Sequence, residues 1–101
     1  MDKPAIDLIC RALASPIRRN ILAWLREPGE YFTSQGATLE RGVSVGEISD
    51  RCGLAKSTVS VHVNALIRAD LLTYRKVRQS IFLKRNESVI RMFIEQIAAD
   101  L

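Results

Sequence analysis

The chain has 101 residues, of which 48% are hydrophobic and 26% are charged, with a net charge of +4. That composition excludes a mainly disordered chain, and the length argues for one domain spanning residues 1–101 and against a two-domain enzyme. No apolar run approaches the roughly 18 residues that cross a bilayer, and no signal-peptide pattern opens the chain. We therefore expect a cytoplasmic protein without a membrane partner.

Few side chains suit catalysis or metal binding. The two cysteines, Cys10 and Cys52, form no CxxC pair, so we expect reduced thiols rather than a structural disulfide. The single histidine, His62, leaves too few soft ligands for a zinc site. No carboxylate pair, activated nucleophile or phosphate-binding glycine loop is recognisable. The sequence predicts no enzyme activity, no cofactor and no metal site.

Charge is distributed unevenly along the chain. Residues 51–91 hold nine Lys and Arg against two acidic residues, a net charge of +7, whereas the remainder sums to −3. A basic half beside a mildly acidic half is typical of a surface that faces a polyanion, most simply nucleic acid. From charge alone, a solvated surface without a partner explains the pattern equally well.

Apolar periodicity predicts two helices at the start of the chain. The first covers residues near 3–14. Ser15 and Pro16 then mark a second start, with serine as the N-cap and proline at the first helical position. We expect this second helix to end at Pro28-Gly29.

Residues 28–42 show no clear period and are long for a loop in a small domain, which indicates a mobile or functional segment. We expect Tyr31 and Phe32 to pack against the body of the protein. Contact with a ligand is the alternative, because long loops often carry function.

Residues 44–69 carry the pattern of a helix-turn-helix. Ser44 and Glu47 form an S-x-x-E capping box at the start of one helix. Gly53 supplies the positive φ of the turn, and Ser49 is small enough for the point where the helices cross. The second helix leaves short polar groups and a lysine pointing outward, which suits insertion into a major groove. These outward side chains are Lys56, Ser57, Ser60, Val61 and Asn64.

Residues 71–76 and 80–84 read as two strands around a basic turn at 77–79, forming a wing at about 72–85. A final helix follows at about 87–100, capped by Asn86. The order helix, helix, helix, turn, helix, hairpin, helix predicts a mainly α fold with a small β-hairpin, a winged helix-turn-helix. The basic side chains of the wing are Arg75, Lys76, Arg78 and Lys84.

These wing side chains would reach phosphates, with Arg78 at the tip best placed for the minor groove. Protection of the strand edge is the alternative for some of them. For His62, packing or a phosphate hydrogen bond is favoured over catalysis, because no nucleophile accompanies it. We expect Arg18-Arg19 to be a surface pair near the DNA backbone. The side chains expected to position a duplex are Thr58, His62, Arg75, Lys76 and Arg78.

The chain resembles the ArsR/SmtB family of bacterial winged-helix repressors over about residues 10–97. LASPIRRNIL at 13–22 is similar to the family's opening L-A-x-P-x-R-x-x-I-L. GLAKSTVSVHVNAL at 53–66 resembles its recognition segment, G-L-S-x-S-T-V-S-x-H-L-x-x-L, and the hairpin follows at the expected distance. The resemblance implies a homodimer built from the first and last helices. Such a dimer would bind an imperfect palindrome of double-stranded DNA and block transcription until an unknown signal releases it.

Departures from the family pattern bear on sensing. Ser44 and Gly46 stand where many members have a pair of metal-binding cysteines, and residues 87–101 contain no histidine. Metal sensing at either family site is therefore not expected. A thiol switch at Cys10 or Cys52 is conceivable, although buried inert cysteine is the commoner case.

A second function from another class is a protein-interaction module, a winged helix that dimerises or docks a partner without reading DNA. Its mark would be an apolar patch on the outer face of the recognition helix, where Val61 is the sole apolar candidate.

Ala55, in place of the family's capping serine, would cost the recognition helix roughly 1 kcal/mol unless Ser57 compensates.

Overall fold

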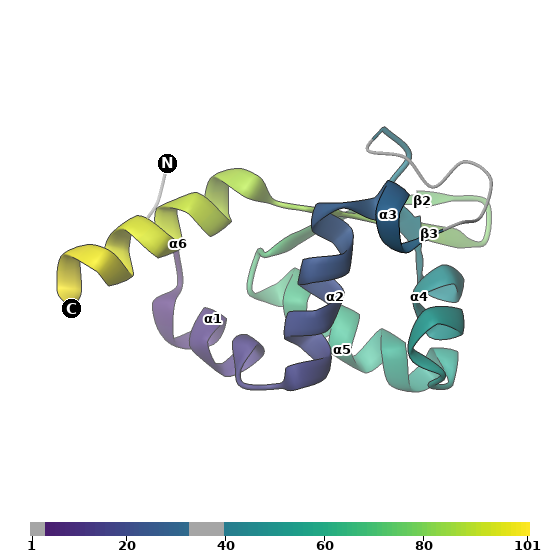
Figure 1. The fold of residues 1–101 in the computed structure, drawn as a ribbon, viewed down its shortest axis with the longest axis horizontal. Helices are drawn as coiled ribbons and strands as arrows, with labels where there is room; N and C mark the ends of the chain where they lie inside the picture. Colours follow the sequence, from purple (N-terminus) through teal and green to yellow (C-terminus); the bar gives the residue numbers. More distant parts are fainter. Residues whose placement is uncertain (1–3, 33–39) are drawn as a thin grey trace.

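The computed structural model describes residues 4–32 and 40–101. Within them, helices α1, α2, α4 and α5 and a three-stranded sheet form the body, from which α6 extends (Figure 1). In chain order the elements are α1 (Ile6–Leu13), α2 (Pro16–Arg26), α3 (Pro28–Tyr31), β1 (Val43–Ser44), α4 (Val45–Cys52), α5 (Lys56–Arg68), β2 (Leu72–Val77), β3 (Ser80–Arg85) and α6 (Glu87–Asp100). In Figure 1, α1 and α6 lie at one end of the molecule and the β2–β3 hairpin at the other.

Local capping determines where α2 and α4 begin. The Ser15 side chain accepts a hydrogen bond from the third residue of α2, and Pro16 occupies the first helical position. In α4, Ser44 Oγ accepts from Glu47 N at 3.1 Å, while Glu47 Oε1 accepts from Ser44 N at 3.0 Å. The predicted capping box is therefore confirmed. Helix α5 begins without a side-chain cap, because Ala55 has no acceptor to offer.

The segment between α2 and α4 differs from the prediction. Helix α2 stops at Arg26, just before Pro28-Gly29, as predicted, but Pro28 also opens the unpredicted one-turn helix α3, since the fixed φ of proline suits a first helical position. Val43 and Ser44 form a strand that the sequence did not indicate. It pairs antiparallel with β3 and makes the sheet three-stranded, in the order β1-β3-β2. Residues 33–39 of the predicted 28–42 loop lie outside the described residues.

One hydrophobic core joins the helices to the inner face of the sheet. Phe32, only 6% exposed, and the partly buried Tyr31 both pack into it, as predicted. None of the helices in the two described ranges is long and apolar enough to cross a membrane. The largest fully buried side chains are Ile9, Ile21, Ile48, Leu66, Leu71, Leu72, Leu83, Val43 and Val59.

Candidate nucleic-acid interface

Helices α4 and α5 form a helix-turn-helix whose turn is held by two small residues. Gly53 adopts a φ of 70°, and its N–H donates to Ser49 O at 2.9 Å. The buried Ser49 side chain donates its hydroxyl hydrogen to Leu54 O at 2.5 Å. The predicted positive φ of Gly53 in the turn is thus confirmed, and the Ser49 hydroxyl ties α4 to the backbone just after that turn.

Helix α5 packs one apolar stripe inward and leaves the opposite side open. Val59, Val63 and Leu66 are each no more than 2% exposed. The predicted contact residues lie on the open side or its margins. Ser60 and His62 are half-buried, whereas Lys56, Ser57, Thr58, Val61 and Asn64 are exposed.

The two margins of this open side face different parts of the protein. Successive residues of a helix are about 100° apart, which places Ser60 and Asn64 on one margin and Thr58 and His62 on the other. Ser60 and Asn64 line a groove shared with the hairpin. His62 accepts a hydrogen bond from Arg18 of α2 through its Nδ1, at 3.1 Å from Arg18 Nε.

Three residues that line the groove between α5 and the hairpin were not predicted from the sequence as site residues. Arg68 follows Asn64 at helical i+4 spacing, a signal that could have found it. Tyr74 and Ile81 line the opposite wall, and Tyr74 is 60% exposed. Alternation alone left the inner face of the hairpin undecided, because Ile81 and Leu83 alternate with polar neighbours only roughly.

Residues of the hairpin divide between its two faces. Lys76 pairs with Ile81 and Arg75 with Phe82, and cross-strand partners share a face. Lys76 therefore lies on the face toward α5, and Arg75 on the outer face. Arg78, with a φ of 57°, occupies the tip of a connection tighter than the predicted turn, since β2 extends to Val77.

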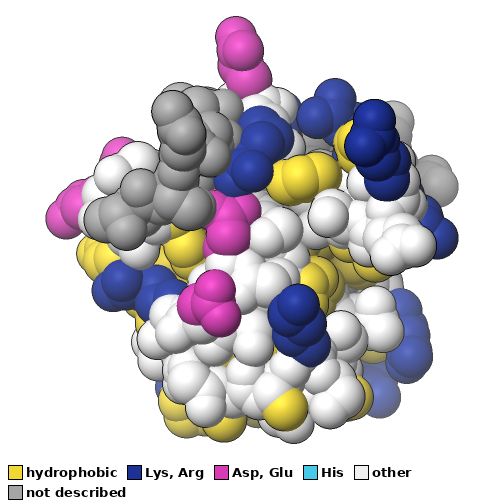
Figure 2. Space-filling view, turned by 90° about the vertical axis from the view of Figure 1, so that its right-hand side faces the viewer, with side chains coloured by type: hydrophobic (Ala, Val, Ile, Leu, Met, Phe, Trp, Pro, Cys, Tyr) yellow, Lys and Arg dark blue, Asp and Glu magenta, His cyan; other side chains and the backbone are white. Residues whose placement is uncertain are grey.

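Basic and acidic side chains are segregated at the end of the molecule that carries the β2–β3 hairpin. Figure 2 shows most Lys and Arg side chains on its right-hand half and most Asp and Glu side chains on the left and in the centre. The exposed basic residues of α5 and the hairpin are Lys56, Arg68, Arg75, Lys76, Arg78 and Lys84. This concentration agrees with a surface that attracts an anion.

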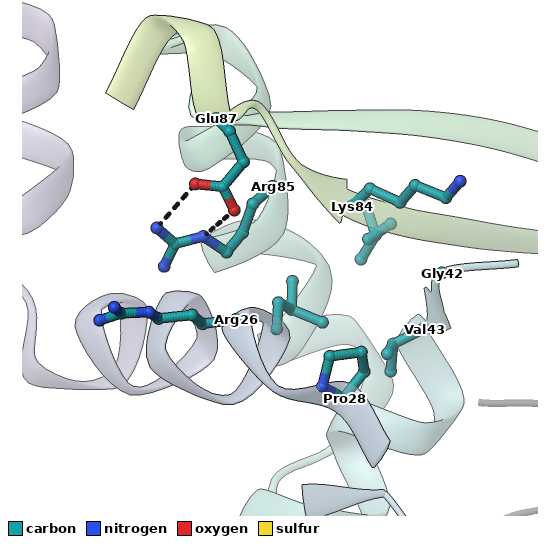
Figure 3. Close-up of a pocket in the computed structure, with 9 residues that line it drawn as sticks. Arg26, Pro28, Gly42, Val43, Lys84, Arg85 and Glu87 are labelled. Carbon is teal, nitrogen blue, oxygen red and sulfur yellow. Dashed lines mark hydrogen bonds and ion pairs between the residues drawn. The ribbon is translucent and has the colours of Figure 1, made fainter. Parts of the chain in front are cut away.

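Arg85, one of the nine basic residues of 51–91, serves a different purpose. Its Nε lies 2.8 Å from Glu87 Oε2, and its Nη1 donates to Leu22 O at 3.0 Å. Figure 3 shows the pair beside the hollow between α2, β1 and β3. These bonds attach the start of α6 to α2, so Arg85 contributes structure rather than a free cation.

The positions of the family's cysteine pair have other uses here. Ser44 belongs to the capping box, and a Cβ at Gly46 would lie 3.5 Å from Lys56 Cε. Within residues 4–32 and 40–101, no cluster of three or more His, Cys, Asp or Glu side chains could hold a metal ion. Cys10 is exposed on α1, and the half-buried Cys52 places its Sγ 3.9 Å from Ser49 O. The thiol switch stays a prediction.

Comparison with known proteins connects this geometry to a family. A family model described as a helix-turn-helix domain matches residues 37–75. YbzH, an uncharacterized HTH-type transcriptional regulator of Bacillus subtilis (strain 168), is 32% identical over 84 residues, which cover 81% of this chain and 84% of YbzH. The chain belongs to the HTH-type transcriptional regulators.

Solved structures of other regulators have a similar fold. Reduced HlyU from Vibrio cholerae N16961 is 28% identical, with a TM-score of 0.61 over 86% of this chain and 80% of HlyU. The homodimeric winged helix-turn-helix DNA-binding domain of Mb0332 from Mycobacterium bovis, a possible ArsR-family transcriptional regulator, is 24% identical. Its TM-score is 0.66, over 94% of this chain and 78% of that one. The predicted winged helix-turn-helix class is confirmed, and so is the resemblance to ArsR-family regulators in fold.

Proposed function

We propose that this regulator is a cytoplasmic homodimer that binds double-stranded DNA at an imperfect palindrome and represses transcription until a signal releases it. The observation that carries the proposal is the open side of α5, which is polar along most of its length and stands beside a basic hairpin. Residues 1–101 would act as one DNA-binding domain. Its helix-turn-helix is about 44–69, its wing about 72–85 and its C-terminal helix about 87–100.

Within this proposal the contact residues divide into two groups. Side chains that point outward from a recognition helix reach base edges in a major groove, whereas side chains at its margin and basic side chains of the wing contact the sugar-phosphate backbone. The base-reading group is Lys56, Ser57, Ser60, Val61 and Asn64. The duplex-positioning group is Thr58, His62, Arg75, Lys76 and Arg78.

Dimerisation through α1 and α6 is supported by apolar side chains left open on both helices. Leu8 of α1 is 38% exposed and Ile94 of α6 is 59% exposed. Burying such side chains against a second copy would remove them from water. Two recognition helices related by a two-fold axis would meet successive major grooves about 34 Å apart, which requires a dyad in the operator.

The test is selection of binding sites from random duplexes, followed by gel shifts of the recovered duplex at several salt concentrations. We expect a recovered site with dyad symmetry and an affinity that falls steeply with salt, because phosphate contacts release counterions. Arg78→Gln should weaken all duplexes alike, whereas Ser60→Ala should change which sequence is preferred. Binding without salt dependence would contradict the electrostatic part of the proposal.

Dimerisation is tested separately by Ile94→Asp, in sedimentation velocity. A charged side chain at a buried interface is unfavourable, so the variant should sediment as a monomer where the wild type sediments as a dimer. Leu101→Asp is a matched control at a side chain that is 97% exposed beyond α6. A dimeric Ile94→Asp variant would overturn this interface.

A second function, docking of a protein partner, is supported by Val61, 63% exposed, and Tyr74, 60% exposed. It predicts that selection recovers no duplex and that Val61→Asp abolishes binding of the partner. The releasing signal is open to one direct test, mass spectrometry of Cys10 and Cys52 after peroxide treatment. If the spectra show neither an adduct nor a disulfide, the releasing signal is not oxidation of a thiol.

A further inference from the structure

The hydrogen bond between Arg18 and His62 determines the state of the histidine ring. The guanidinium of Arg18 can only donate, so the Nδ1 atom of His62, 3.1 Å from Arg18 Nε, must offer a lone pair. With Nδ1 engaged as the acceptor, the nitrogen that the ring can offer as a donor is Nε2. Arg18, 44 residues earlier in the chain, thereby gives His62 a defined donor, Nε2–H.

Further donors remain on Arg18 itself. Its two terminal nitrogens, Nη1 and Nη2, have no hydrogen-bond or ion-pair partner among the described residues. Arg18 and His62 are both half-buried, so their positions are restrained while part of each side chain meets solvent. Together they offer one charge and several N–H groups from two elements, a donor set suited to phosphate oxygens.

The position of this pair on α5 indicates which phosphates it would meet. At about 100° per residue, the margin with Thr58 and His62 lies about 160° around the helix from the margin with Ser60 and Asn64. The latter faces the hairpin and its basic residues. A helix inserted in a major groove has one sugar-phosphate strand on either side. The margin with Ser60 and Asn64 therefore faces one DNA strand. The margin with Thr58 and His62, beside which Arg18 lies, faces the other.

We propose that Arg18 and His62 form a phosphate-binding site that holds the DNA strand on the side of the recognition helix away from the wing. In this site Arg18 also acts as a positioning residue, because it fixes the tautomer and orientation of His62. The site rests on the proposed DNA-binding function and adds a second element, α2, to the interface. If the bond serves only to attach α2 to α5, neither side chain contributes to the dependence of affinity on salt.

The test compares Arg18→Gln with Arg26→Gln on the duplex recovered by selection with the wild type. Both changes remove one positive charge from α2, but Arg26 is exposed and has no hydrogen-bond partner among the residues described. Loss of one phosphate contact should reduce the slope of log affinity against log salt by about 0.9 per protomer. We expect this reduction for Arg18→Gln and an unchanged slope for Arg26→Gln.

Two further measurements separate positioning from simple attachment. Long-range ¹⁵N–¹H spectra of the imidazole should show the Nε2–H tautomer in the wild type and in Arg26→Gln, and a mixture of tautomers in Arg18→Gln. His62→Gln keeps one acceptor and one donor and should retain most of the affinity, whereas His62→Phe keeps only the ring and should lose about tenfold. Circular dichroism confirms that each variant is folded.

Phosphate-ethylation interference locates the contact. Ethylation of a contacted phosphate weakens binding of the wild type. The phosphates whose ethylation no longer matters in Arg18→Gln should lie on one strand of each half-site, and those whose ethylation no longer matters in Lys76→Gln should lie on the other strand. Failure of the wild type to recover any duplex would overturn the proposed function. A wild type that binds, with Arg18→Gln matching Arg26→Gln in slope and interference, would overturn the phosphate site and leave the proposed function standing.

Discussion

Gly53 allows the energetic cost of the helix-turn-helix turn to be measured almost in isolation. Its φ is 70°, and a Cβ added there would meet no heavy atom within 4 Å. Gly53→Ala therefore introduces backbone strain without a clash. A left-handed conformation costs an L-residue roughly 1–2 kcal/mol, and the lower entropy of the unfolded alanine chain offsets about 0.4–1 kcal/mol of it. We expect a net loss of about 1 kcal/mol in the free energy of unfolding.

Gly29→Ala is the matched control. A Cβ added at Gly29 would also meet no heavy atom within 4 Å, but this glycine lies in the short helix α3 and not at a positive φ. The same reduction of unfolded-state entropy should stabilise this variant by about 0.4–1 kcal/mol. Since the unfolded-state contribution is common to both changes, the difference between them, about 1–2 kcal/mol, measures the strain at Gly53.

Urea denaturation, followed by far-ultraviolet circular dichroism as a measure of helix content, gives both free energies at one fixed protein concentration. Thermal midpoints should differ by roughly 4–8 °C per kcal/mol for a domain of this size. Gly42→Ala extends the series, because its φ is 84° and its Cβ would lie 2.6 Å from Leu83 O. This variant should be the least stable of the three. Equal stability of Gly53→Ala and Gly29→Ala would refute the reasoning.

Other substitutions test the remaining parts of the fold by the same denaturation. Ile48→Ala, at a side chain with no exposure, should lower the free energy of unfolding by about 2–5 kcal/mol, and a loss below about 1 kcal/mol would contradict its place in the core. Ser49→Ala removes the donor to Leu54 O and should cost about 1–3 kcal/mol, unless that carbonyl finds another partner. Ser44→Ala removes the cap of α4 and should cost about 1 kcal/mol. Val61→Ala, at an exposed site, should stay within about 0.5 kcal/mol of the wild type.

Elements marked by a local chemical signal were predicted from the sequence. Ser15 with Pro16 marks the start of α2, the Ser44 capping box marks α4, and Gly53 marks the turn. Each signal acts on residues close to it in the chain, so it can be recognised without knowledge of the tertiary structure. The order of elements, and with it the fold class, follows from these signals and from apolar periodicity.

Two features escaped prediction because they have no local signal. The strand of Val43 and Ser44 is too short to show alternation, and it exists because β3 offers a free edge. The bond between Arg18 and His62 joins residues of two helices, and no sequence spacing indicates it. The proposed contact residues lie on or beside the open side of α5 and on the hairpin, but their contacts with DNA stay predictions.

The third strand has a consequence for the hairpin. Val43 and Ser44 pair with Leu83 and Phe82, so β3 is held on both sides at its middle, and Arg41 stacks on the Phe82 ring at 4.9 Å. A hairpin supported in this way is preorganised, and a partner that docks on it does not have to order it first. Association with such a partner would then forfeit less conformational entropy, because the hairpin would bind with a shape it already has.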